Sequence, residues 1–212
     1  MLRACVALLM FLAATIPVDA ESPARTALVV IDVQQFYFEG GSVPLAGPDE
    51  AARRAVRVLA KFREAGLPVI HVQHLPDGVQ HPDPTGVEPQ YRIHPTVLPL
   101  PGEPVVGKHH ANAFRETDLL ATLRELGARR LVIAGMQTHM CVEAAARAAA
   151  DLGFDVVVVG DACATRALEF GGVEVPAEKV HAATLASLDG GYARVLTTDE
   201  LLAELREADP PR

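Results

Sequence analysis

Three polar residues of this chain could together perform acyl transfer: Asp32, Lys108 and Cys141. A thiolate attacks a carbonyl carbon, a carboxylate can carry a proton to the leaving nitrogen, and an ammonium favours the charged thiolate. Cys141 stands in the first turn of a predicted helix, where unpaired N–H groups and the helix dipole also favour ionisation. We therefore expect Cys141 to ionise readily; the alternative is a small buried cysteine that only packs.

The segment around Cys141 predicts a β-α-β unit. The apolar run at residues 131–134 is short enough for a strand that is buried on both faces. Apolar residues then recur at three- and four-residue spacing over residues 142–152, as they do in an amphipathic helix. Gly153 is a suitable C-cap for that helix, and residues 156–159 form a second buried strand.

Predicted strands and helices also alternate along the rest of the chain. The other predicted strands cover residues 26–33, 69–73, 105–106 and 193–196, and the other predicted helices cover residues 49–65, 117–126, 176–188 and 198–207. Residues 74–104 are rich in Pro, Gly and His, and we expect this long loop to cover a substrate or to contact another subunit. Residues 161–175 are predicted to form a second loop.

This alternation predicts one domain with a three-layer α/β/α sandwich fold. Its six-stranded parallel sheet should have the strand order 3-2-1-4-5-6. Ligands of such sheets bind beyond the carboxyl ends of the strands, where the strand order reverses. Asp32 and Cys141 would follow neighbouring strands at that point. Lys108 would follow the edge strand, so its side chain would have to reach across the sheet.

The composition restricts the partners of the protein. The chain has 212 residues, half of them hydrophobic and none of them Trp, and its formal net charge is −8. This charge argues against nucleic acid or an anionic membrane as the main partner. Beyond the first 20 residues the cysteines are Cys141 and Cys163, which are too few for a disulfide framework. In an oxidising compartment these two could still pair with each other.

The first 20 residues have the three parts of a secretory signal peptide. Arg3 supplies the positive region, residues 4–16 are apolar, and small residues precede a cleavage position after Ala20. We therefore expect an exported protein, periplasmic or secreted, whose mature domain covers residues 21–212. A cytoplasmic protein with a non-functional leader is the alternative.

Three segments, in this order, resemble the isochorismatase-like cysteine hydrolases. They are IDVQQFYF, which contains Asp32, GKHHANAF, which contains Lys108, and AGMQTHMCVEAAARAAADLGFDVVVVGDACATR, which contains Cys141. The resemblance covers residues 26–202. It implies an Asp-Lys-Cys triad at these three positions, and a cis peptide bond between Met136 and Gln137. In the family this bond aims the Gln137 N–H, together with the Cys141 N–H, at the oxyanion that develops in the reaction.

The resemblance also implies a substrate pocket and an oligomer. Phe36, Phe114 and His109 are similar to pocket residues of the family, although either phenylalanine could belong to the core and His109 to a solvated loop. Family members assemble as dimers or tetramers, so we expect a homodimer or homotetramer. A small-molecule substrate is the other expected partner, with no membrane contact after leader removal.

Two departures from related subfamilies narrow the reaction. Nicotinamidases carry an Asp-x-His metal motif after the second strand, whereas this chain reads HVQHLPDG there, so we expect no metal and no cofactor. His71 and His74 are three residues apart on a strand and point to opposite faces, which makes them a poor ligand pair. Isochorismatases lack the cysteine nucleophile, so Cys141 argues against hydrolysis of a vinyl ether.

These observations predict a metal-independent cysteine hydrolase. It would cleave a C–N bond of a small amide, ureide or carbamoyl compound through a thioester on Cys141. A nicotinamidase-like or isochorismatase-type hydrolase is one alternative. A non-catalytic relative that binds a metabolite or a partner chain is the alternative from another class.

Overall fold

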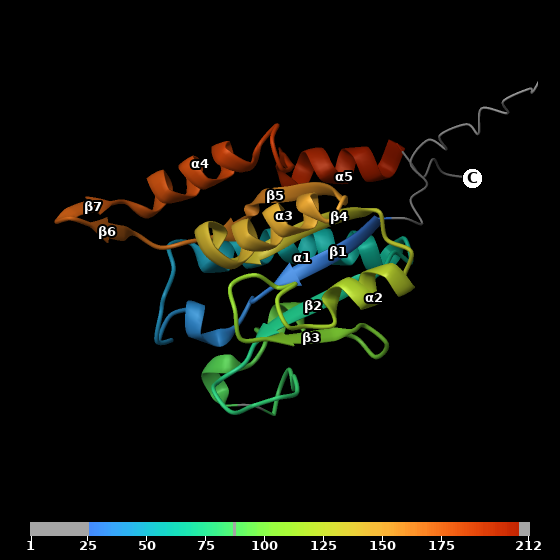
Figure 1. The fold of residues 1–212 in the computed structure, drawn as a ribbon, viewed down its shortest axis with the longest axis horizontal. Helices are drawn as coiled ribbons and strands as arrows, with labels where there is room; N and C mark the ends of the chain where they lie inside the picture. The colour runs from blue at the N-terminus through green and yellow to red at the C-terminus, as the bar shows by residue number, and fades with distance from the viewer. Residues whose placement is uncertain (1–25, 87, 208–212) are drawn as a thin grey trace, which may run out of the picture.

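The fold is built on a six-stranded parallel sheet (Figure 1). The computed structural model describes residues 26–86 and 88–207, so the predicted leader lies outside the described residues. The strand order is β3-β2-β1-β4-β5-β8, which confirms the predicted order because β8 is the sixth strand of this sheet along the chain. The strands are β1 (Thr26–Ile31), β2 (Val69–His74), β3 (Val105–Lys108), β4 (Arg130–Met136), β5 (Asp155–Ala164) and β8 (Arg194–Leu196).

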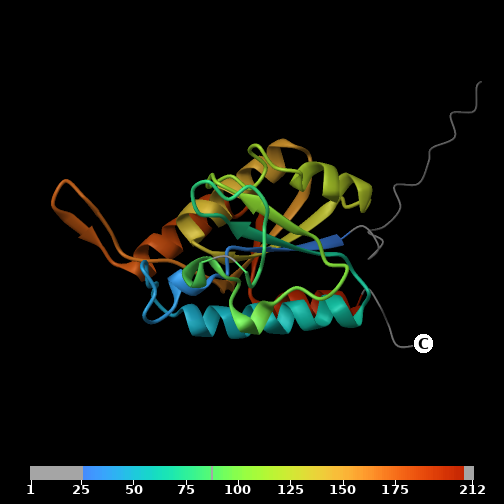
Figure 2. The same ribbon diagram turned by 90° about the horizontal axis from the view of Figure 1, so that it is seen from below.

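Helices cover both faces of the sheet (Figure 2). One face carries α1 (Pro48–Glu64) and α5 (Thr198–Glu207), and the other carries α2 (Leu119–Glu125), α3 (Glu143–Asp151) and α4 (Ala177–Leu188). Short helical turns complete the chain: η2 (Gln35–Tyr37), η3 (Pro89–Tyr91), η4 (Pro95–Val97) and the π-helical η5 (Thr138–Val142). None of the described helices is both long and apolar enough to cross a membrane.

Apolar side chains form a separate core on each face of the sheet. In β1, Leu28 and Val30 belong to the core with α1 and α5, whereas Val29 and Ile31 belong to the core with α2, α3 and α4. Because neither face is open to water, the strands are apolar on both sides. This explains why they stand out as continuous apolar runs in the sequence.

The 17-residue helix α1 has suitable residues at both of its ends. Pro48 is its first residue, and the fixed φ of proline suits the first helical turn. Asp49 and Glu50 lie in the first turn, and Lys61 and Arg63 lie in the last, so the charges oppose the helix dipole. These local signals explain why the predicted and observed helices agree to within one residue.

The prediction of a loop at residues 161–175 was wrong. β5 continues to Ala164, and β6 (Leu168–Phe170) and β7 (Val173–Val175) then form an antiparallel hairpin that projects from the body (Figure 1). Strands of three residues are too short to give a clear alternating pattern, which is why the sequence did not reveal them. The hairpin is also largely exposed, with Phe170 89% accessible, so it lacks the apolar run that indicates a buried strand.

Gly135 allows β1 and β4 to approach closely at the end where the site lies. It pairs with Ile31 of β1 on one side and with Cys163 of β5 on the other. Its φ is 135°, and an added Cβ atom would lie only 1.9 Å from Ile31 O. Only glycine fits this position, because any side chain would collide with the backbone of the neighbouring strand. The residues that follow β1 and β4 are thereby held side by side.

Candidate active site

Asp32 directly follows β1, in a backbone conformation that few residues other than glycine adopt. Its φ is 49°, and its side chain is fully buried. The Asp32 N–H donates a hydrogen bond of 3.0 Å to Val72 O, so the backbone is still paired with β2 where it turns. Aspartate tolerates the left-handed conformation better than most residues because its short polar side chain can bond locally. The turn places a carboxylate at the carboxyl end of a central strand.

Lys108 is the last residue of β3, and its buried side chain reaches from the edge of the sheet to the centre. Its Nζ lies 2.6 Å from Asp32 Oδ2 and donates hydrogen bonds to Cys141 Sγ at 3.3 Å and to His110 O at 3.1 Å. An ammonium has three hydrogens to donate, and three acceptors surround this one. The expected reach across β2 is therefore present.

Cys141 lies in η5, the π-helical turn that leads into α3. The N–H groups of Met140 and Val142 both donate to Gln137 O, at 3.1 and 3.2 Å. This tight start holds the cysteine at the carboxyl end of β4, beside the turn that carries Asp32. The residue is 6% accessible and lines a cavity. π-helical turns occur frequently at functional sites.

The thiol does not ionise readily, contrary to the expectation from its place in the helix. Burial, and after it the negative charge of Asp32, raise the pKa of Cys141 to about 12, although Lys108 opposes both. Burial alone would lower the pKa of Lys108, but the Asp32 carboxylate and the hydrogen bond to the Cys141 sulfur outweigh burial and raise it. The site therefore holds the Asp32–Lys108 ion pair beside a neutral thiol. Desolvation dominates because the cysteine is enclosed by side chains that are far from it in sequence.

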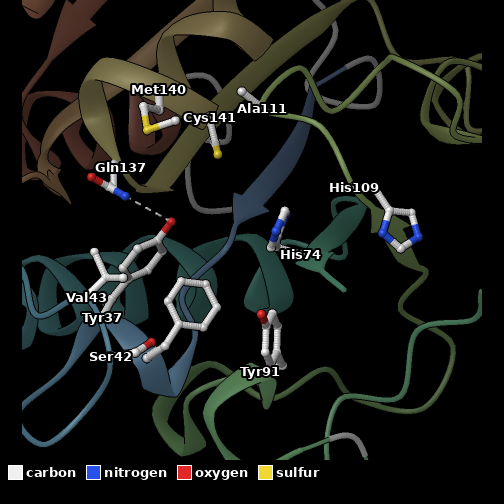
Figure 3. A pocket seen from close by; sticks show the side chains of 11 residues that line it. Tyr37, Ser42, Val43, His74, Tyr91, His109, Ala111, Gln137, Met140 and Cys141 are labelled. Carbon is white, nitrogen blue, oxygen red and sulfur yellow. Dashed lines mark hydrogen bonds between the residues drawn. The ribbon is translucent and has the colours of Figure 1, made fainter. Parts of the chain in front are cut away.

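The peptide bond between Met136 and Gln137 is cis. The Gln137 side chain points toward Tyr37, and its Nε2 donates a hydrogen bond of 3.3 Å to the hydroxyl oxygen of Tyr37 (Figure 3). The sequence analysis did not single out Tyr37, although it stands five residues after Asp32 in the IDVQQFYF segment.

The cavity beside Cys141 has a volume of about 340 Å³, which suits a small molecule. It is lined by Phe36, Tyr37, Ser42, Val43, His74, Tyr91, His109, Ala111, Gln137, Met140 and Cys141 (Figure 3). Two of the predicted pocket residues, Phe36 and His109, belong to this lining. Phe114 does not: it is partly buried, packs against the core on the face of α2, α3 and α4, and its ring stacks on Phe154 at a centroid distance of 6.4 Å.

Gln34, which the sequence analysis also missed, fixes one wall of the cavity. Its buried Nε2 donates to His74 O at 2.9 Å and to Tyr91 O at 2.6 Å, and its Oε1 accepts from the His74 N–H at 2.8 Å. Gln73 Nε2 also donates to Tyr91 O, at 3.0 Å. The loop of residues 74–104 thus contributes Tyr91 to the wall and is pinned to the sheet by two buried amides.

Two of the histidines are hydrogen-bonded to glutamate side chains. His71 Nε2 bonds to Glu103 Oε2 at 2.9 Å, and His110 Nε2 bonds to Glu116 Oε2 at 3.1 Å. His74 lines the cavity, and burial and the nearby Lys108 lower its pKa, so it is neutral at pH 7. Within residues 26–86 and 88–207, no three His, Cys, Asp or Glu side chains are grouped as a metal ion requires.

The second cysteine, Cys163, is a free thiol in the structure, as is Cys141. Cys163 is buried on β5, in register with Gly135. Burial raises the pKa of its thiol to about 12. It does not line the cavity beside Cys141.

Comparisons with known proteins identify relatives of this chain. The sequence profile of the Isochorismatase domain matches residues 26–200. The chain is 46% identical over 181 residues to the isochorismatase family protein YddQ of Bacillus subtilis, covering 84% of this chain and 98% of that protein. It is 29% identical over 197 residues to a maleamate amidohydrolase of Pseudomonas putida, covering 86% and 87% of the two chains.

A solved structure is similar over nearly the whole described fold. The crystal structure of an isochorismatase hydrolase from Oleispira antarctica superposes with a TM-score of 0.80 at 45% identity, covering 87% of this chain and 99% of that one. Profile, sequence and structure therefore agree over the part of the chain that carries Asp32, Lys108 and Cys141. The chain belongs to the isochorismatase family of hydrolases.

Proposed function

We propose that this hydrolase is a cysteine amidase that cleaves a C–N bond of a small amide, ureide or carbamoyl compound without a metal ion. One observation carries the proposal: the buried Lys108 ammonium contacts both the Asp32 carboxylate and the Cys141 sulfur at the cavity. A nucleophile, a proton carrier and a fixed positive charge therefore meet at one point. The similarity to a maleamate amidohydrolase supports an amide as the substrate.

The first half of the reaction forms a thioester. Because the pKa of Cys141 is raised, the thiol must lose its proton as it attacks, and Asp32 is the base that accepts it. The sulfur bonds to the carbonyl carbon, and the C=O π electrons move to the oxygen. The backbone N–H groups of Gln137 and Cys141 stabilise this oxyanion. The C–N bond then breaks, and the leaving nitrogen takes the proton from Asp32.

The second half hydrolyses the thioester. Asp32 accepts a proton from a water molecule as the water oxygen bonds to the acyl carbon. The C–S bond then breaks, the acid leaves, and the sulfur regains a proton from Asp32. Lys108 stays protonated throughout, because its pKa is raised above the ordinary value, and it stabilises the negative charge on sulfur or carboxylate.

Two further properties belong to the proposal: a homo-oligomeric state, dimer or tetramer, and export to the periplasm or outside the cell. The exposed Phe170 and Val173 of the β6–β7 hairpin support an interface with another subunit, because exposed apolar side chains on a projecting arm are suited to burial. Light scattering coupled to size-exclusion chromatography measures the oligomeric state directly.

The activity can be tested with a panel of maleamate, nicotinamide, benzamide and an N-carbamoyl amino acid, with ammonia release as the readout. We expect at least one compound to be turned over, and the rate to stay unchanged after treatment with EDTA and removal of the chelator. During turnover, a peptide containing Cys141 should carry the mass of the acyl group, and added hydroxylamine should convert that group to a hydroxamate.

Cys141→Ala is expected to lose both the adduct and the turnover, whereas Cys163→Ala should keep them, because Cys163 does not line the cavity. An EDTA-sensitive rate that zinc restores would favour the nicotinamidase-like alternative. Binding of panel compounds without any turnover would favour the non-catalytic alternative.

A further inference from the structure

The proposed oxyanion donors are both backbone groups, but a third polar hydrogen faces the same end of the cavity. It belongs to the phenol of Tyr37, whose hydroxyl points toward Gln137 and Cys141 in Figure 3. The residue is 5% accessible and lines the cavity. Its ring is held by Phe36, with a centroid distance of 4.1 Å, and its backbone N–H and C=O are bonded to Gln34 and Leu45.

The direction of the bond between Tyr37 and Gln137 leaves the phenol hydrogen available. The amide nitrogen of Gln137 can only donate, so the Tyr37 oxygen is the acceptor of their 3.3 Å bond. The O–H hydrogen then needs an acceptor of its own, and within residues 26–86 and 88–207 no second hydrogen bond of this hydroxyl is found. A buried donor without a partner is unfavourable because it has lost its bond to water, and a bound acceptor would relieve this cost.

The phenol also keeps its proton under the conditions of catalysis. Burial raises the pKa of Tyr37 above its ordinary value, and the negative charge of Asp32 raises it further. The hydroxyl is therefore a neutral donor close to the carboxylate and the sulfur. Tyr37 cannot compete with Asp32 for the thiol proton, because a phenol that still holds its own proton is not a base.

We propose that Tyr37 is a third oxyanion donor, which gives its phenol hydrogen bond to the acyl oxygen of the substrate during attack by Cys141. This inference rests on the amidase function proposed above. A side-chain O–H aimed at a developing oxyanion stabilises the transition state more than the ground state, because the charge on the oxygen grows during attack.

The test is Tyr37→Phe, which removes one oxygen atom and keeps the ring. On the panel compound that the wild-type protein hydrolyses fastest, we expect kcat to fall at least about tenfold while KM changes less than about threefold. Tyr192→Phe removes a phenol oxygen from an exposed residue that does not line the cavity, and it should leave both constants unchanged. Thermal unfolding should show that both variants are folded.

An aldehyde gives a readout that a merely structural role would not change. In the aldehyde analogue of the chosen amide, CHO replaces the carboxamide; the Cys141 sulfur bonds to the aldehyde carbon, and the thiol proton ends on the oxygen as a thiohemiacetal. We expect Tyr37→Phe to weaken inhibition by this aldehyde by the same factor as kcat/KM. With 4-aminophenylalanine at position 37, which restores a donor, inhibition and kcat should recover; 4-methylphenylalanine, of similar size, should behave like Phe.

The outcomes separate this inference from the function on which it rests. If the wild-type protein hydrolyses no panel compound, the proposed amidase function fails. If it does hydrolyse one, but Tyr37→Phe keeps kcat and aldehyde inhibition within about twofold, the function stands and the role of Tyr37 is wrong. Should Tyr37→Phe not fold, the comparison of the amino and methyl analogues decides, and equal rates for these two would reject the inference.

Discussion

Lys108 Nζ lies 2.6 Å from Asp32 Oδ2, and both side chains are completely shielded from solvent. The two residues are 76 positions apart, and they come from β3 at the edge of the sheet and from the turn after β1 at its centre. A buried ion pair of this kind is seldom favourable on balance, because both charges lose their hydration. Its place beside Cys141 fits the catalytic role proposed above.

This ion pair leads to a prediction about the reactivity of Cys141. Lys108→Met removes the charge that lowers the Cys141 pKa, so alkylation by iodoacetamide should shift to higher pH. Asp32→Asn removes a charge that raises this pKa, so alkylation should shift to lower pH. Turnover should nevertheless be lost in Asp32→Asn, because no base is left to carry the proton. The check is the rate of Cys141 labelling against pH, followed by peptide mass spectrometry, with Cys163 as the internal control.

Circular dichroism must first show that both variants are folded. Equal labelling of Cys141 in wild-type protein and both variants at every pH would contradict the proposed triad, because the thiol would then be insensitive to its two charged neighbours.

The same pair predicts a non-additive effect on stability. At pH 7, Lys108→Met should lower the free energy of unfolding by about 3 kcal/mol, because the Asp32 carboxylate is left buried without its partner. The double variant Asp32→Asn/Lys108→Met buries no unpaired charge and should regain a large part of this loss. Urea unfolding of the wild-type protein, both single variants and the double variant gives the coupling. Additive effects would mean that the two charges do not interact in the folded protein.

Glu103 predicts a dependence of stability on pH. Burial alone would raise the pKa of Glu103, but hydrogen bonds from Arg63, the Leu100 N–H and His71 outweigh it and lower the pKa to about 2. A lowered folded-state pKa stabilises the protein above the ordinary value of 4.5, and this contribution disappears as the pH falls from 4.5 towards 2.

Glu103→Gln should therefore unfold more easily than wild type by on the order of 2 kcal/mol at pH 7, and this difference should shrink below pH 4.5. Denaturant unfolding at a series of pH values measures it. Glu50→Gln is the matched control, since the Glu50 pairs with Arg53 and Arg54 lie on an exposed helix surface and should contribute little. A difference for Glu103→Gln that is constant with pH would show that this carboxylate is not the source.

The leader carries a prediction about processing. Protein isolated from its native host should begin at Glu21, and it should be found outside the cytoplasm. Mass spectrometry of the N-terminal peptide, together with cell fractionation, checks both points. A cytoplasmic chain that begins at Met1 would show that residues 1–20 do not act as a signal. If a reductant raises the activity of protein isolated from an oxidising compartment, Cys141 and Cys163 were paired there.

Much of the fold follows from local patterns in the sequence. The strands of the sheet are apolar on both sides because helices cover both faces, and α5 begins and ends at the predicted residues, 198 and 207. Such signals are local: a residue and its near neighbours reveal the period of burial. The β6–β7 hairpin escaped prediction because its two short strands are exposed and have no such period.

The chemistry of the site depends on contacts between residues that are far apart in sequence. Cys141 was expected to ionise readily from its helix position, but burial and Asp32, 109 residues away, raise its pKa to about 12. Tyr37 and Gln137, 100 residues apart, share a hydrogen bond that no sequence pattern indicates. The sequence alone therefore determined the strands of the sheet, the helices that cover it and the residue types that end the strands. Only the tertiary structure decided which charges meet in the buried site, and hence where each proton lies.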